Sequence, residues 1–181
     1  MNALLARLLV VATLGTILTV PYAIGQQNPP SPYPAACGPV EANFVVKRTP
    51  TPGDPTIPPS DKALVYLIES MPNYPVITKK VNIGMDGTWL GATDTMTHIS
   101  FTVDPGIHHL CAVYQGHAVD IGEEARTLLL HLDAQAGKVY YLRYHAFITR
   151  DGGTVSFQPI DEDEGIFLVQ HTEQATSKLK K

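Results

Sequence analysis

The chain contains little charge and little cysteine. Only 17% of its 181 residues are charged, and 13 basic residues stand against 17 acidic ones. Nucleic acids and anionic membrane surfaces attract clusters of Lys and Arg, so this balance argues against both as partners. Three lysines close to the end of the chain are expected to form a solvated basic tail: Lys178, Lys180 and Lys181.

The motifs of common catalytic centres are missing as well. The sequence has no G-x-S-x-G elbow, no H-E-x-x-H pair, no phosphate-binding loop and no dinucleotide glycine pattern. Cys111 could act as a nucleophile with His108 or His109 as its base, but neighbouring residues on a strand point to opposite faces. We therefore expect no catalytic residue, no cofactor and no enzymatic activity. A small metal-dependent or hydrolytic envelope enzyme is the alternative.

The seven histidines form no familiar metal-binding motif. A zinc or copper site requires several converging ligands, three or four in the usual case. His109 and Cys111 are two residues apart and share a strand face, and His131 could meet a cross-strand neighbour such as His145. Most of the histidines have the position of outward-facing strand residues, so we expect no metal site.

One uncharged apolar run, residues 8–20, lies near the N-terminus. A membrane-spanning helix needs about 20 apolar residues, whereas this shorter run is typical of a secretory signal. Ala23 and Gly25 place small residues at the −3 and −1 positions of a cleavage site before Gln26. We predict a signal peptide at residues 1–25. In the alternative, an uncleaved N-terminal anchor, this segment would be the means of membrane association.

The two cysteines, Cys37 and Cys111, can pair in an exported chain. The pair would close a loop of about 75 residues, for which the chain-entropy description gives roughly 4 kcal/mol of stabilisation. Two buried, inert thiols are the alternative. We predict the disulfide, and with it an exported protein of the periplasm or extracellular space that associates with the envelope.

The remainder of the chain divides by composition. Residues 26–60 are rich in proline and are expected to be extended, with one strand at residues 40–47. Residues 61–175 form the main domain, in which short β-type runs alternate with turn residues, and residues 176–181 form the basic tail. The runs with strand character are residues 63–68, 77–85, 88–91, 98–103, 107–114, 125–132, 139–148 and 154–160.

About eight short strands at regular spacing predict an all-β fold, an antiparallel β-sandwich of immunoglobulin or transthyretin type. Residues 86–87 carry the Asp-Gly signal of a tight hairpin. A short C-terminal helix is expected after Asp161, which can cap it, with Glu164 three residues further on. A calcium site is the alternative for this acidic stretch, but no EF-hand spacing surrounds it.

The run at residues 139–147 has two different faces. Tyr140, Leu142 and Tyr144 belong to the face that resembles core. The other face mixes rings with polar tips, as sheet surfaces that bind sugars or peptides often do, and it consists of Tyr141, Arg143, His145 and Phe147. This second set is a candidate ligand face. We favour the simpler interpretation, in which the C-terminal helix or the N-terminal segment covers this face.

Several segments, taken together, resemble the bacterial proteins grouped as domain of unknown function 2846. The resemblance spans roughly residues 36–170 and depends on the order and spacing of these motifs. They are residues 36–39 (ACGP), 62–66 (KALVY), 83–92 (IGMDGTWLGA), 103–106 (VDPG) through 110–112 (LCA), 136–141 (AGKVYY) and 161–165 (DEDEG). Residues 104–113 are also similar to small PEGA-type sandwich modules, which is a likeness of fold.

This resemblance implies an exported β-sandwich of bacterial cell envelopes, often a lipoprotein, and it implies no catalytic residues. The chain departs from the lipoprotein pattern, because the small residues before Cys37 lie well past the apolar run. We therefore expect a non-catalytic module with a binding or structural role. Its partner would be an envelope protein or a glycan.

Overall fold

A computed structural model describes residues 34–38, 42–50, 57–70, 80–115, 127–149 and 152–180, with the side chains of residues 146–149 and 152–155 left out of the description. The predicted signal peptide, residues 1–25, lies outside these ranges. Among the described residues, no helix is both long and apolar enough to cross a membrane.

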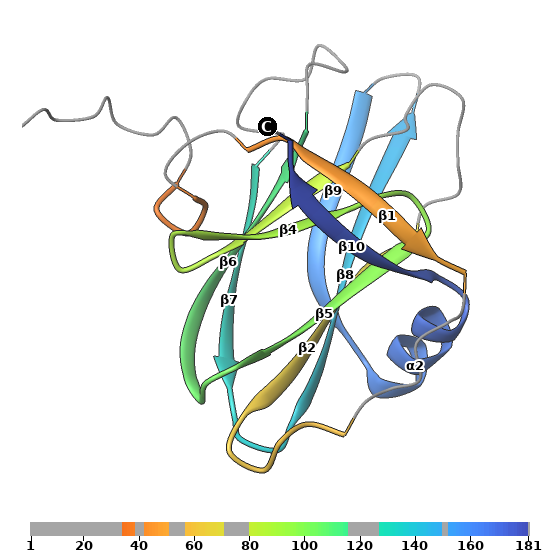
Figure 1. Ribbon diagram of the computed structural model, residues 1–181. Helices are drawn as coiled ribbons and strands as arrows, with labels where there is room; N and C mark the ends of the chain where they lie inside the picture. Colours follow the sequence, from red (N-terminus) through yellow and green to blue (C-terminus); the bar gives the residue numbers. More distant parts are fainter. Residues whose placement is uncertain are drawn as a thin grey trace, which may run out of the picture.

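Two sheets pack face to face, and one short helix accompanies them (Figure 1). The larger sheet has the strand order β1 (Phe44–Thr49), β10 (Glu173–Leu179), β5 (Thr97–Val103), β2 (Ala63–Glu69), β8 (Val139–Thr149) and β9 (Gly152–Ile160). The smaller sheet has the order β4 (Thr88–Thr93), β3 (Val81–Met85), β6 (Gly106–Tyr114) and β7 (Thr127–Ala134), and the helix is α2 (Glu162–Gln170). The predicted all-β sandwich with a short C-terminal helix is confirmed. Two neighbouring pairs, β2 with β8 and β10 with β5, are parallel.

Strand β2 is buried along its whole length. Alternate residues, such as Val65 and Leu67, enter the core between the sheets. The residues between them, such as Tyr66 and Ile68, pack in a second apolar cluster together with Val169 of α2. Because both faces of β2 are covered, its sequence is a continuous apolar run rather than an alternating one.

The β3–β4 hairpin turns at the predicted place. Asp86 and Gly87 both have positive φ, 49° and 83°, as a two-residue type I′ turn requires. Asp tolerates this left-handed backbone because its short polar side chain can form local hydrogen bonds, and Gly has no Cβ to obstruct it. The Asp-Gly pair therefore sets the register next to the turn, where Met85 pairs with Thr88, and an irregularity between Ile83 and Gly84 shifts the register by one residue further along.

The end of the chain differs from the expected solvated tail. Residues 173–179 form β10, which lies between β1 and β5 in the larger sheet. Its side chains give almost no strand signal, since Ala175 is its one buried apolar residue. Backbone pairing with β1 holds it in place, with Lys178 opposite Val45, and the amide of Lys180 donates to the carbonyl of Asn43.

Helix α2 begins as the sequence predicts. The carboxylate of Asp161 accepts a hydrogen bond from the amide of Glu164 at 2.8 Å, which satisfies one free donor of the first turn. The acidic residues that follow complement the positive end of the helix dipole. One turn in, Gly165 is buried against the ring of Tyr141 on β8, where a Cβ would overlap that ring. The missing side chain at residue 165 lets the helix approach the sheet.

Replacing Gly165 by Ala tests this close approach. In a free helix the change would stabilise by about 1 kcal/mol. Here the added Cβ meets the Cβ, Cγ and Cδ1 atoms of Tyr141 rather than a mobile tip, so the ring must shift. We expect a net loss of about 1–3 kcal/mol in the free energy of unfolding, measured in urea. Gln170→Ala, at an exposed position of α2, is the control and should change little. An unchanged or higher stability of Gly165→Ala would contradict the contact.

Candidate functional site

Helix α2 covers Tyr141, the first residue of the candidate ligand face. Tyr141 is only 5% exposed. Its ring is stacked on Tyr66 of β2, with 5.4 Å between ring centroids and 10° between planes, in the cluster that includes Val169 of α2. The interpretation favoured from the sequence, that the C-terminal helix covers this face, therefore holds for Tyr141.

Arg143 connects the sheet to the same helix. Its Nε donates to Ser70 Oγ at 2.8 Å, and its Nη1 lies 2.6 Å from Glu164 Oε1. Both charged side chains remain partly exposed, so the ion pair is worth at most about 1 kcal/mol. The main effect of Arg143 is positional, because its two contacts link the end of β2 to the first turn of α2.

The other two residues of the candidate ligand face lie further along β8. His145 is half-buried, and burial together with the positive charge of Arg143 lowers its pKa. The side chain of Phe147 lies outside the described residues. The structure thus assigns Tyr141 and Arg143 to the contact with α2, and a ligand role for His145 and Phe147 stays a hypothesis.

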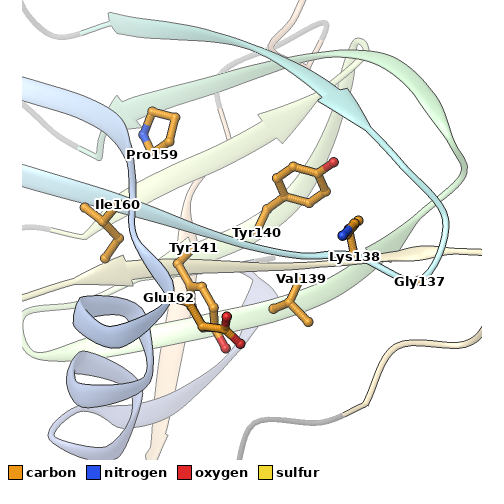
Figure 2. Close-up of a pocket in the computed structure, with 8 residues that line it drawn as sticks. All are labelled: Gly137, Lys138, Val139, Tyr140, Tyr141, Pro159, Ile160 and Glu162. Carbon is orange, nitrogen blue, oxygen red and sulfur yellow. The ribbon is translucent and has the colours of Figure 1, made fainter.

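A groove opens beside Tyr141, where β8 begins (Figure 2). It has a volume of about 310 Å³, at the small end of the range for ligand sites. The β7–β8 turn and the first residues of β8 form one side, and the end of β9 and the start of α2 form the other. The lining residues are Gly137, Lys138, Val139, Tyr140, Tyr141, Pro159, Ile160 and Glu162.

The groove combines apolar walls with two charged side chains. Val139 and Ile160 border the cluster beneath α2, while Lys138 and Glu162 contribute opposite charges. Burial raises the pKa of the Tyr141 hydroxyl, and nearby Tyr66 and Glu162 act in the same direction. The hydroxyl is therefore neutral at physiological pH. A small apolar group with a polar end fits such a lining.

Tyr140 has a structural task beside the groove. Its hydroxyl donates to the carbonyl of Asp133 and accepts from the amide of Gln135, both at 3.0 Å. These bonds hold the β7–β8 turn against β8. Sequence reasoning found Tyr141 but not the rest of this lining, because the groove forms only where β8, β9 and α2 meet.

The predicted disulfide is confirmed. Cys37 and Cys111 are bonded, with their Cα atoms 5.3 Å apart, and both are buried. They form a small apolar cluster with Val113 on β6 and the partly buried Trp89 on β4. Because the sulfur of Cys111 is part of the disulfide, Cys111 is not available as a nucleophilic thiol.

Beside the disulfide, Asp86 connects the β3–β4 turn to β6. Its Oδ2 lies 2.6 Å from His108 Nδ1, and its Oδ1 accepts from the amide of His109 at 2.8 Å. Burial opposes protonation of His108, but the bonds to Asp86 and to the carbonyl of Asp104 outweigh it and raise the His108 pKa. These contacts lower the pKa of Asp86 in spite of its partial burial. They brace the hairpin against β6.

The cross-strand neighbour of His131 is His109, not His145. The two pair directly between β6 and β7, and their rings are stacked with 5.0 Å between centroids and 3° between planes. His145 belongs to the other sheet. Within the described residues, no group of three or more His, Cys, Asp or Glu side chains converges as metal ligands do.

Comparison with protein-family models, with curated proteins and with solved structures finds no match for this chain. The resemblance to domain of unknown function 2846 therefore stays a prediction from the sequence motifs. The residues that carry it include the hairpin turn at Asp86, the disulfide partner Cys111 and the helix cap Asp161. Each of these has a structural task in the fold.

Proposed function

We propose that this protein is an exported, non-catalytic β-sandwich module of the bacterial cell envelope, and that it binds an envelope protein or glycan through the groove at the start of β8. The Cys37–Cys111 disulfide is the observation that carries the proposal. Disulfides form and persist in oxidising compartments such as the periplasm and the extracellular space. The bond joins a segment just downstream of the predicted signal peptide to β6.

The contacts of that N-terminal segment support an architectural role for the disulfide. The carbonyl of Ala36 accepts from the amide of Gly87 at 3.2 Å, and Cys37 is buried against β6. The segment is therefore attached to the sandwich by the disulfide, and a hydrogen bond to the hairpin turn supports it. A chain that emerges unfolded from an export channel would gain this attachment on oxidation.

The groove supports the binding role because it combines apolar walls with charged side chains. Envelope peptides and glycans present apolar faces next to hydroxyl, amide or charged groups. Val139 and Ile160 can contact such a face, while Lys138 and Glu162 can pair with the polar groups. Small ligand sites are generally apolar with a few convergent polar groups, as here.

Export is tested with an alkaline phosphatase fusion, which is active only outside the cytoplasm. The full chain fused to the reporter should give activity, and a fusion that lacks residues 1–25 should give none. Unfolded, unreduced mature protein should contain no free thiol. An inactive full-length fusion would contradict export, and two free thiols would contradict the disulfide.

Binding at the groove is tested by photo-crosslinking in intact envelopes. A photoreactive residue at position 138 lies at the groove, whereas one at position 170 lies on the exposed end of α2 and serves as the control. We expect a discrete crosslinked adduct from position 138 and none from position 170. Equal crosslinking from both positions, or none from either, would contradict the groove as the binding site.

A further inference from the structure

We propose that His109 and His131 form a two-imidazole site for a divalent transition metal on the outer face of the smaller sheet. Both side chains are exposed, and the residues are direct partners in the β6–β7 ladder. Their rings are parallel within 3°, with centroids 5.0 Å apart. The proposal is independent of the function proposed above.

The backbone brings these two side chains as close as an antiparallel sheet allows. The amide of His109 donates to Asp86 Oδ1, and its carbonyl accepts from the amide of Asp86. Both groups therefore point toward the β3–β4 turn and away from β7. His109 and His131 consequently form a non-hydrogen-bonded pair, the type whose Cα atoms are only about 4.5 Å apart.

Asp86 also fixes the position of His109 on β6. Its carboxylate holds the amide of His109 and the ring of His108 at the same time, at 2.8 and 2.6 Å. Two residues further along β6, Cys111 is tied to the N-terminal segment. The main chain that carries one imidazole is therefore held from two directions, which reduces the ordering that a bound ion would require.

The chemistry of the pair favours copper over zinc. Imidazole nitrogen suits Zn²⁺, Ni²⁺ and Cu²⁺, and for one set of ligands affinity rises to Cu²⁺ in the first-row series. A bound ion takes a nitrogen from each ring at about 2 Å, which the exposed rings reach by turning about their side-chain bonds. Water fills the remaining positions. Asp133, two residues beyond His131 on the same face of β7, adds nearby negative charge.

The test is a Cu²⁺ titration of the mature, untagged protein by calorimetry, with His109→Gln and His131→Gln as variants. We expect one ion per chain, and a loss of affinity of at least about 10–100-fold in either variant, because the loss of a group that only supports a ligand already costs that much. The double variant should lose little more than either single one, because each change already destroys the chelate. His171→Gln, which removes an exposed histidine at the end of α2, is the matched control and should bind as the wild type does.

Two further measurements distinguish copper binding at this site from adventitious copper binding. The EPR spectrum of the 1:1 complex should show coupling to two imidazole nitrogens in the wild type, and this pattern should be lost in both variants. Added Cu²⁺ should raise the melting temperature of the wild type but not of the variants, because an ion that binds only the folded state stabilises it. Melting without metal shows that the variants fold. Wild-type affinity in His109→Gln or in His131→Gln would overturn the proposal, as would an equal loss in His171→Gln.

Discussion

Replacing both Cys37 and Cys111 by Ala is expected to lower the free energy of unfolding by about 4 kcal/mol. The two residues are 74 positions apart, so the bond removes a large loop-closure entropy from the unfolded chain. Alanine is preferred to serine because Cys111 is fully buried, and a hydroxyl without a partner would add a cost of its own. Urea unfolding at equilibrium, without reductant, measures the difference.

The single variants provide the control for this prediction. Each of them removes the same bond, so Cys37→Ala, Cys111→Ala and the double variant should have nearly equal stabilities. Reduction of the wild type should produce a loss of similar size. A loss below about 1 kcal/mol in the double variant would mean that the disulfide adds little to the stability of the sandwich, contrary to the loop-closure argument.

Acidification from pH 8 to pH 5 is expected to cost the folded state about 2 kcal/mol through His98 alone. This residue on β5 is 1% exposed, and its Nδ1 lies 2.8 Å from Thr172 Oγ1. Burial lowers its pKa from the usual 6.5 to about 4. Between these two values the unfolded chain takes up a proton that the folded protein resists, so stability falls as the pH drops through this range.

The comparison with His98→Gln isolates this effect. The variant cannot be protonated at residue 98, so its stability should vary less with pH between 5 and 8. His108, whose pKa is raised, acts in the opposite direction, but its contribution is present in both proteins and cancels in the difference. The measurement is the urea midpoint at several pH values. Parallel pH profiles for the two proteins would contradict the buried, neutral state of His98.

Local features of the sequence were sufficient for most of the elements. The Asp-Gly pair at residues 86–87 requires a tight turn whatever lies around it, and Asp161 with Glu164 caps a helix by contacts within one turn. The strand run expected at residues 125–132 contains most of β7 (Thr127–Ala134). These predictions succeed because the interactions involved connect residues close together in the chain.

The candidate site was only partly accessible from the sequence. Tyr141 was identified by its face of β8, yet its burial depends on α2, which packs through the gap left by Gly165. Pro159, Ile160 and Glu162 join the groove from a later part of the chain. The alternation of apolar and polar residues along β5 places His98 on the outward face. It is nevertheless buried, because the turn after α2 brings Thr172 against it.

By itself the sequence determined the strand-rich fold, its turns, the helix cap and the two cysteines available to pair. Only the tertiary structure decided the order of the strands, the addition of β10 to the larger sheet and the partner of His131. Pairing between distant strands is set by the summed packing of both faces, and a shift of one residue would turn every side chain to the opposite face. Local sequence patterns do not show how distant strands pack together. The groove and the His109–His131 pair can therefore be recognised only in the assembled sheets.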